Sequence, residues 1–235
     1  QINANTLQIE NEYYSTIRPK PDPNIKKRPS KALLESGVNY IELRSIDNNI
    51  FSNTGIDIDQ MYFIELLMIH SLITNDSQIS QEEYIESKNN LTNVAHNGRD
   101  KEFKLINNNQ AKSIALALRE ILSELRKIAE LMYKITNDDK YIRCIKKQEE
   151  KFENNCKLPS NLVIDKMIEN KFSFYEFCME SIWEQKKHFS TLNFDNDIIK
   201  KLKKESLGSI EKKKLLEKNI TESYEDYIRR YFSEK

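Results

Sequence analysis

The octapeptide Tyr-Ile-Glu-Leu-Arg-Ser-Ile-Asp, from Tyr40 to Asp47, decides the fold of this chain. Apolar and polar residues alternate in it, a pattern typical of a half-buried β-strand. Because successive side chains of a strand point to opposite faces, Tyr40, Glu42 and Arg44 share one face. A carboxylate can ligate Mg²⁺, and a guanidinium can bind a phosphoryl group through two hydrogen bonds. The stretch therefore fits either a metal–nucleotide site or an ion pair on a solvated sheet face.

A second strand is expected upstream, from Leu7 to Ser15, where polar and apolar side chains again alternate. One face of this strand carries only polar or amphipathic side chains, namely Gln8, Glu10, Glu12 and Tyr14. Such a face either is solvated or meets a cation or a polar ligand. We expect the two strands to be antiparallel neighbours.

A basic loop is expected between these strands, from Ile17 to Arg28. Prolines at positions 19, 21 and 23 disfavour regular strand pairing there. The cations of the loop are Arg18, Lys20, Lys26, Lys27 and Arg28. They are either merely solvated or available to contact phosphates. A short helix follows from Lys31 to Glu35, with Ser30 as its N-cap and Gly37 as its stop.

After Gly55 the hydrophobic period changes from two to 3.6, which predicts an almost wholly helical remainder. Asp57 or Asp59 is expected to cap a helix that runs to about Ile73. The strongest amphipathic pattern covers Gln110 to Tyr133. Further helices are predicted over Gln81–Val94, Tyr141–Phe152, Pro159–Asn170, a segment carrying the aromatic residues from Phe172 to Trp183, Asp197–Glu217 and Glu222–Phe232. His70 has no second metal-ligating residue at a suitable spacing, so it is expected to be a satisfied histidine in the core or at its boundary.

Composition limits the function classes. The 235 residues include 37 Lys and Arg and 37 Asp and Glu, for a net charge of +0, which argues against nucleic-acid binding. The longest apolar run, Met61–Ile73, contains Glu65 and His70 and is too short to span a bilayer. The N-terminal residues lack a signal-peptide pattern. The three cysteines, Cys144, Cys156 and Cys178, fit no zinc or redox spacing, so reduced, buried thiols in a cytoplasmic protein are expected.

The motifs around the octapeptide closely resemble those of the proteobacterial-type glutamate–cysteine ligases, which catalyse the first step of glutathione synthesis. These motifs are Asn11–Lys20 (NEYYSTIRPK), Pro29–Leu34 (PSKALL), Gly37–Ser45 (GVNYIELRS), Asn49–Phe51 (NIF) and Gly55–Asp57 (GID). The resemblance is specific from Gln1 to about Ile73 and continues weakly to the C-terminus. Chains of this family are about twice as long, and this chain resembles their C-terminal portion. Because it begins with Gln rather than Met, an incomplete sequence record is expected.

The resemblance implies an α+β fold. Residues 1–56 would form part of a glutamine-synthetase-like antiparallel sheet, and residues 57–235 a mostly helical region. It also implies that ATP phosphorylates the γ-carboxylate of L-glutamate, that L-cysteine attacks the γ-glutamyl phosphate, and that Mg²⁺ neutralises the phosphates. The implied partners are therefore small molecules, with neither nucleic acid nor membrane. The full-length form is expected to be a cytoplasmic monomer.

The resemblance also assigns roles to individual residues. It implies that Glu42 binds the metal, that Arg44 is catalytic and contacts the transferred phosphoryl group, and that Ser45 contacts the nucleotide. Tyr14 matches a tyrosine near the cysteine-substrate pocket, while the segment Arg18–Lys20 matches a loop without an assigned role. One carboxylate does not hold a Mg²⁺–ATP pair, so the isolated chain is expected to be inactive. The alternative is a non-catalytic helical interaction or structural module, or a subunit that needs a separate N-terminal chain.

Overall fold

The computed structural model describes residues 4, 6–74, 78–100, 102–153 and 157–233. Their contacts form two compact units. One unit comprises the described parts of residues 1–47 and 191–235, and the other comprises those of residues 48–190. The division into a catalytic sheet, residues 1–56, and a helical region, residues 57–235, stays a prediction.

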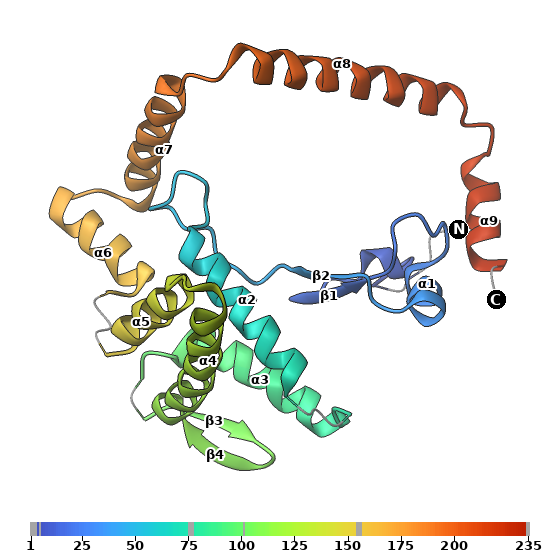
Figure 1. The fold of residues 1–235 in the computed structure, drawn as a ribbon. Helices are drawn as coiled ribbons and strands as arrows, with labels where there is room; N and C mark the ends of the chain where they lie inside the picture. Colours follow the sequence, from blue (N-terminus) through green and yellow to red (C-terminus); the bar gives the residue numbers. More distant parts are fainter. Residues whose placement is uncertain (1–3, 5, 75–77, 101, 154–156, 234–235) are drawn as a thin grey trace. The chain divides into compact units, whose positions relative to one another are not determined.

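The first unit contains an antiparallel strand pair (Figure 1). Strand β2, Tyr40–Leu43, lies within the octapeptide, as predicted, and pairs with β1, Ile17–Lys20. The register places Arg18 opposite Glu42 and Lys20 opposite Tyr40.

The prediction of a strand from Leu7 to Ser15 is wrong. This segment contains a short 3-10 helix, η1 (Glu10–Glu12), and the strand lies instead in the segment expected to be a loop. Local bonds explain the difference, because the Gln8 amide donates to the Glu12 carboxylate at 2.8 Å and the Tyr13 amide donates to the Glu10 carbonyl. Pro19 is tolerated in β1 because, within the described part of the chain, β1 pairs only with β2.

Three helices complete the first unit. Helix α1, Pro29–Ser36, begins earlier than predicted, because Pro29 suits the first turn and Arg28, not Ser30, is the N-cap residue. It ends at Gly37 as expected, where φ is +72°. Helix α8, Asn196–Lys218, has no buried residue, and α9, Tyr224–Ser233, buries Tyr231.

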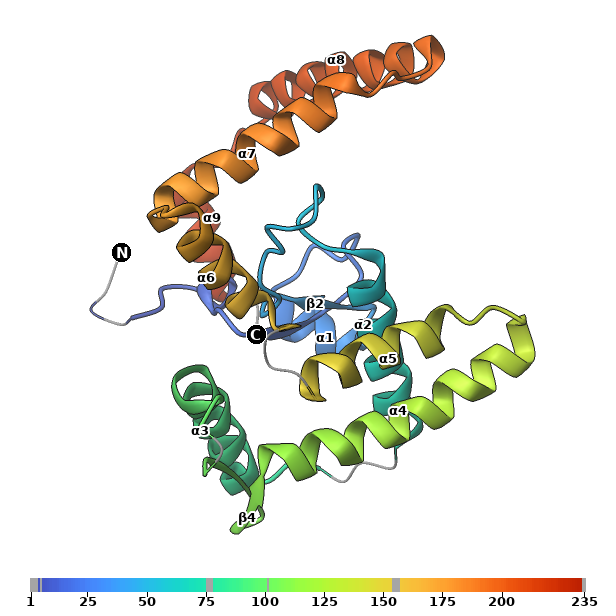
Figure 2. The same cartoon turned by 90° about the vertical axis from the view of Figure 1, so that its left-hand side faces the viewer.

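Three helices form the core of the second unit: α2 (Ile58–Ile73), α4 (Ile114–Thr136) and α5 (Lys140–Glu153). They lie side by side in both views (Figures 1 and 2). The buried residues of this cluster are Leu66, Leu122, Leu125, Ile128, Ala129, Tyr141, Cys144 and Ile145. Asp57 caps α2, as predicted, and Gln60 completes a capping box. His70 has a partner at the edge of the core, since its Nε2 lies 2.5 Å from Glu124, which confirms its expected structural role.

A β-hairpin in the second unit was not predicted. It consists of β3 (Lys104–Asn107) and β4 (Gln110–Ser113), so α4 begins at Ile114 and not at Gln110. Asn108 and Asn109 both have positive φ, as a two-residue type I′ turn requires. Their amides donate to the carboxylate of Glu86, on α3 (Gln81–Asn97). The hairpin thus depends on a helix that precedes it in the sequence.

The remaining helices confirm the expected helical region. They are α6, Pro159–Asn170, and α7, Phe174–Thr191. The fold is α+β, and two strands lie beyond residue 80 in the described part of the chain. None of the helices described combines the length and apolar character that crossing a membrane requires. Cys144 is buried and Cys178 half-buried, both as free thiols, while Cys156 lies outside the described residues.

Candidate functional site

The polar face of the β1–β2 pair brings several predicted site residues together. Residues opposite each other in an antiparallel pair point to the same face, so Arg18, Lys20 and Glu42 lie together there. The Glu42 Oε2 atom lies 3.0 Å from both Lys20 Nζ and Arg44 Nη2. Arg44 continues this face beyond the end of β2, and its amide donates to the Thr16 carbonyl at 2.8 Å.

Tyr14 reaches this face from the segment before β1. The Arg44 guanidinium lies over the Tyr14 ring, 4.9 Å from its centroid, in a cation–π contact. Arg18 on β1 also binds this segment, because its Nη1 donates to the carbonyls of Asn11 and Tyr13 at 3.3 Å each. The structure therefore joins Tyr14, Glu42 and Arg44 in one cluster. The Tyr14 side chain remains 70% exposed and open to a ligand.

The cluster carries an excess of positive charge. Lys20 and Arg44 both form ion pairs with the Glu42 carboxylate, and Arg18 lies opposite Glu42 in the register, so these four charged residues carry two cations in excess. Hydrogen bonds from Arg44 and then from Lys20 hold the pKa of Glu42 below its usual range, so this carboxylate is ionised at neutral pH. A cationic face of this kind attracts anions such as phosphates, and arginine binds two phosphate oxygens at once.

The same cluster is a poor magnesium site by itself. In the described parts of the chain, no group of three or more His, Cys, Asp and Glu residues is arranged to hold a metal ion. Glu42 is the one carboxylate of the cluster, and its Oε2 already faces two cations. Octahedral Mg²⁺ requires six oxygen ligands. The described residues therefore do not fit Mg²⁺ without further ligands from phosphates, water or other protein groups.

Ser45 differs from the other predicted site residues. It follows Arg44 directly and is exposed, and within the described chain its side chain makes none of the hydrogen bonds that join the cluster. Conversely, Arg18 and Lys20 were expected in a loop, whereas the structure places them on a strand opposite β2. Apolar and basic residues alternate from Ile17 to Lys20, which is a strand pattern. The prolines of this segment nevertheless favoured the prediction of a loop.

Comparison with known proteins identifies the family. The sequence model of the family described as "Glutamate-cysteine ligase" matches residues 1–94. The glutamate–cysteine ligase of Leptospira interrogans is 35% identical over 93% of this chain, and that of Alcanivorax borkumensis is 32% identical over 99%. The chain belongs to the glutamate–cysteine ligase family. It covers 42% and 44% of these two relatives, so it spans less than half their length.

Two solved structures match the fold of this chain. The crystal structure of a glutamate–cysteine ligase from Francisella tularensis, in complex with AMP, superposes with a TM-score of 0.87 at 28% identity. The superposition covers 97% of this chain and 45% of that ligase. A bifunctional glutathione synthetase from Pasteurella multocida matches at 19% identity over 77% of this chain and 22% of its own, with a TM-score of 0.59, which indicates a shared fold.

Proposed function

We propose that this chain takes part in the ATP-dependent ligation of the γ-carboxylate of L-glutamate to the amine of L-cysteine, the first step of glutathione biosynthesis. Membership of the glutamate–cysteine ligase family supports the overall reaction. The observation that carries the assignment of the site is the Arg44 guanidinium, held between the carboxylate of Glu42 and the ring of Tyr14 on a cationic strand pair.

The proposed reaction has two displacements. A γ-carboxylate oxygen of glutamate attacks the γ-phosphorus of ATP, and ADP leaves with the electrons of the broken bond. The amine of cysteine then attacks the acyl carbon, loses a proton, and expels inorganic phosphate. Negative charge is spread over the phosphoryl oxygens in the first step, so fixed positive groups stabilise its transition state.

Arg44 is the proposed catalytic residue and also binds substrate. Its planar guanidinium can meet two phosphoryl oxygens at once. Glu42 and Tyr14 restrict its orientation from two sides, so little reorganisation is needed when the phosphoryl group arrives. Lys20 and Arg18 add positive charge to the same face. The AMP present in the Francisella tularensis structure is consistent with a nucleotide site in this fold.

The remaining assignments belong to the same proposal. Tyr14 offers an exposed aromatic face to the cysteine substrate, and Ser45 contacts the nucleotide. Glu42 contributes one ligand to Mg²⁺, whose other ligands the described residues do not provide. A cytoplasmic location fits the two free thiols described, Cys144 and Cys178. A monomeric full-length form also remains a proposal.

Equilibrium binding of ATP to the 235-residue chain tests the nucleotide assignment. Arg44→Ala should weaken binding at least tenfold, the effect of losing about 1.4 kcal/mol. Arg143→Ala is a matched control, because Arg143 is also an ion-paired arginine, with Asp139, but lies on α5. Equal losses in both variants would show that ATP responds only to net charge and would overturn the assignment.

The same experiment separates the alternative function. A non-catalytic helical module would bind ATP equally in the original chain and in the Arg44→Ala variant, or in neither. Selective loss of binding in Arg44→Ala therefore favours the ligase site.

A further inference from the structure

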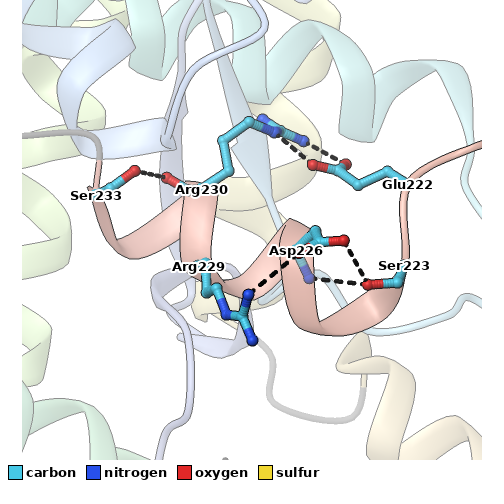
Figure 3. A network of polar contacts seen from close by, with 6 residues as sticks. All are labelled: Glu222, Ser223, Asp226, Arg229, Arg230 and Ser233. Atoms are coloured by element: carbon cyan, nitrogen blue, oxygen red, sulfur yellow. Dashed lines mark hydrogen bonds and ion pairs between the residues drawn. The ribbon is translucent and has the colours of Figure 1, made fainter.

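The C-terminal helix α9 is bound to the segment that carries Tyr14. Figure 3 shows how α9 is itself fixed at its start. The Ser223 hydroxyl accepts a hydrogen bond from the Asp226 amide at 3.1 Å, and Arg230 donates two hydrogen bonds to Glu222 at 2.9 and 3.0 Å. Because Arg230 lies in the last turn, these bonds connect the two ends of the helix.

Tyr231 links this helix to the N-terminal segment. Its side chain is 7% exposed, and its hydroxyl donates to Asn11 Oδ1 at 3.0 Å, across 220 positions of sequence. The Arg28 guanidinium lies 5.0 Å from the centroid of the Tyr231 ring. Among the described residues, Arg28 Nε is buried without a hydrogen-bond partner, and Glu10 Oε1 lies 3.6 Å from it. The aromatic ring therefore provides part of the stabilisation of this guanidinium.

From Asn11 the connection continues to the proposed site. The Asn11 carbonyl accepts a hydrogen bond from Arg18 on β1, and the Tyr13 carbonyl accepts another from the same Nη1 atom. Tyr14 follows directly and stacks on Arg44. Tyr14 is mostly exposed, so its position depends on how firmly the preceding backbone is held. Tyr231 connects α9 to this segment through the Asn11 side chain, whose Oδ1 accepts the hydrogen bond of the Tyr231 hydroxyl.

We propose that Tyr231 is a positioning residue, which holds the segment 8–14 so that Tyr14 stays against Arg44. The role of this contact in ligand binding rests on the proposed function, whereas the coupling between α9 and the segment does not. Small displacements of residues around a reacting group weaken catalysis strongly, so a fixed segment benefits the site. The hydroxyl, and not the ring alone, is the atom that reaches Asn11.

Amide hydrogen exchange in the 235-residue chain tests the coupling. Tyr231→Phe keeps the ring and removes only the hydroxyl. It should speed exchange of the Glu12 and Tyr13 amides, which the turn protects, about fivefold, the effect of losing one ordinary hydrogen bond. Tyr224→Phe, on the same helix but 66% exposed, is the control and should leave this exchange unchanged. Unchanged exchange in Tyr231→Phe, or a change confined to α9, would overturn the proposal.

A variant of the acceptor residue, Asn11, provides a second test of the hydrogen bond from Tyr231. Asn11→Ala removes the acceptor, so it should reproduce the effect of Tyr231→Phe. The double variant should exchange no faster than either single variant, because both remove the same interaction. Additive effects would contradict a direct bond between these two side chains.

ATP binding by the same chain distinguishes positioning from a purely structural role. Tyr231→Phe should raise the Kd for ATP several-fold, while Tyr224→Phe should not. If exchange increases but ATP binding is unaffected in a chain that binds ATP, the contact is only structural and the positioning role is wrong. If the unsubstituted chain does not bind ATP while Tyr231→Phe still speeds exchange, the proposed function fails and the coupling stands.

Discussion

Glu42 and Arg44 form an ion pair, and the proposed function assigns a phosphate contact to the same guanidinium. Their period-two spacing predicts a shared face, and the 3.0 Å contact between them confirms it. The pair is partly exposed and screened by solvent, so its contribution to stability is small. The pair mainly orients the Arg44 guanidinium, because the Glu42 carboxylate and the Tyr14 ring limit its positions.

Tyr141 provides a pH-dependent test of the core of the second unit. Its hydroxyl donates to Glu65 at 2.8 Å, and burial, together with this bond, raises its pKa from 10.0 to about 12. The fold therefore favours the neutral phenol. Its contribution to stability is complete below pH 10 and is lost as the pH rises from about 10 to about 12.

Denaturant unfolding at pH 8 and pH 11 measures this contribution. The original chain should lose more stability between these two pH values than Tyr141→Phe, which has no phenolic proton to lose. Other groups titrate in both proteins, so only the difference between them is informative. Parallel losses would show that Tyr141 is not coupled to folding.

The two described cysteines should differ in reactivity. Burial, and secondarily the charge of Asp59, raises the pKa of the Cys144 thiol to about 11, and the side chain is inaccessible. Because the thiolate is the reactive form, Cys144 should resist alkylation at pH 8, whereas half-buried Cys178 should react. Timed labelling followed by peptide mass spectrometry measures both rates. Comparable rates in the folded protein would contradict the packing of α5 against α2 and α4.

Helix α4 carries both buried and exposed leucines, whose substitution should affect stability differently. Leu125 is fully buried between α2 and α5, whereas Leu131, six residues later on α4, is 56% exposed. Leu125→Ala should lower the free energy of unfolding by about 2–5 kcal/mol, the usual cost of such a cavity. Leu131→Ala should change it by less than about 0.5 kcal/mol. Thermal or urea unfolding of both variants measures the difference, and equal costs would contradict the position of α4.

The helices were predictable because their signals are local. Asp57 and Gly37 mark helix ends in the sequence, and apolar spacing defines α2 and α4. The strands were less predictable because their pairing is not local. The prolines near β1 hid a strand that β2 stabilises, and the β3–β4 hairpin depends on Glu86 of α3. Of the candidate site, the Glu42–Arg44 pair was predictable, whereas the positions of Lys20 and Arg18 required the register of the sheet.

The whole ligases of Leptospira interrogans and Alcanivorax borkumensis are more than twice as long as this chain. Among the described residues, the polar face of the strand pair offers one carboxylate, Glu42, as a metal ligand. We therefore expect residues 1–235 alone to release no ADP in response to glutamate and cysteine. A coupled assay of ADP release tests this expectation, and clear turnover by the chain alone would show that other residues complete the site.

We propose that Arg44 acts on the transferred phosphoryl group. The most direct measurement is the kinetics of a ligase in which this chain replaces the aligned 42% of the Leptospira interrogans relative. Lysine cannot reproduce the two-point contact of a guanidinium, so Arg44→Lys should lower kcat about 10²–10³-fold and change the KM for ATP much less. Arg143→Lys is the control and should have neither effect. Turnover by Arg44→Lys equal to that of the unsubstituted ligase would contradict a catalytic role of Arg44 and leave Glu42 and Arg44 as a structural ion pair.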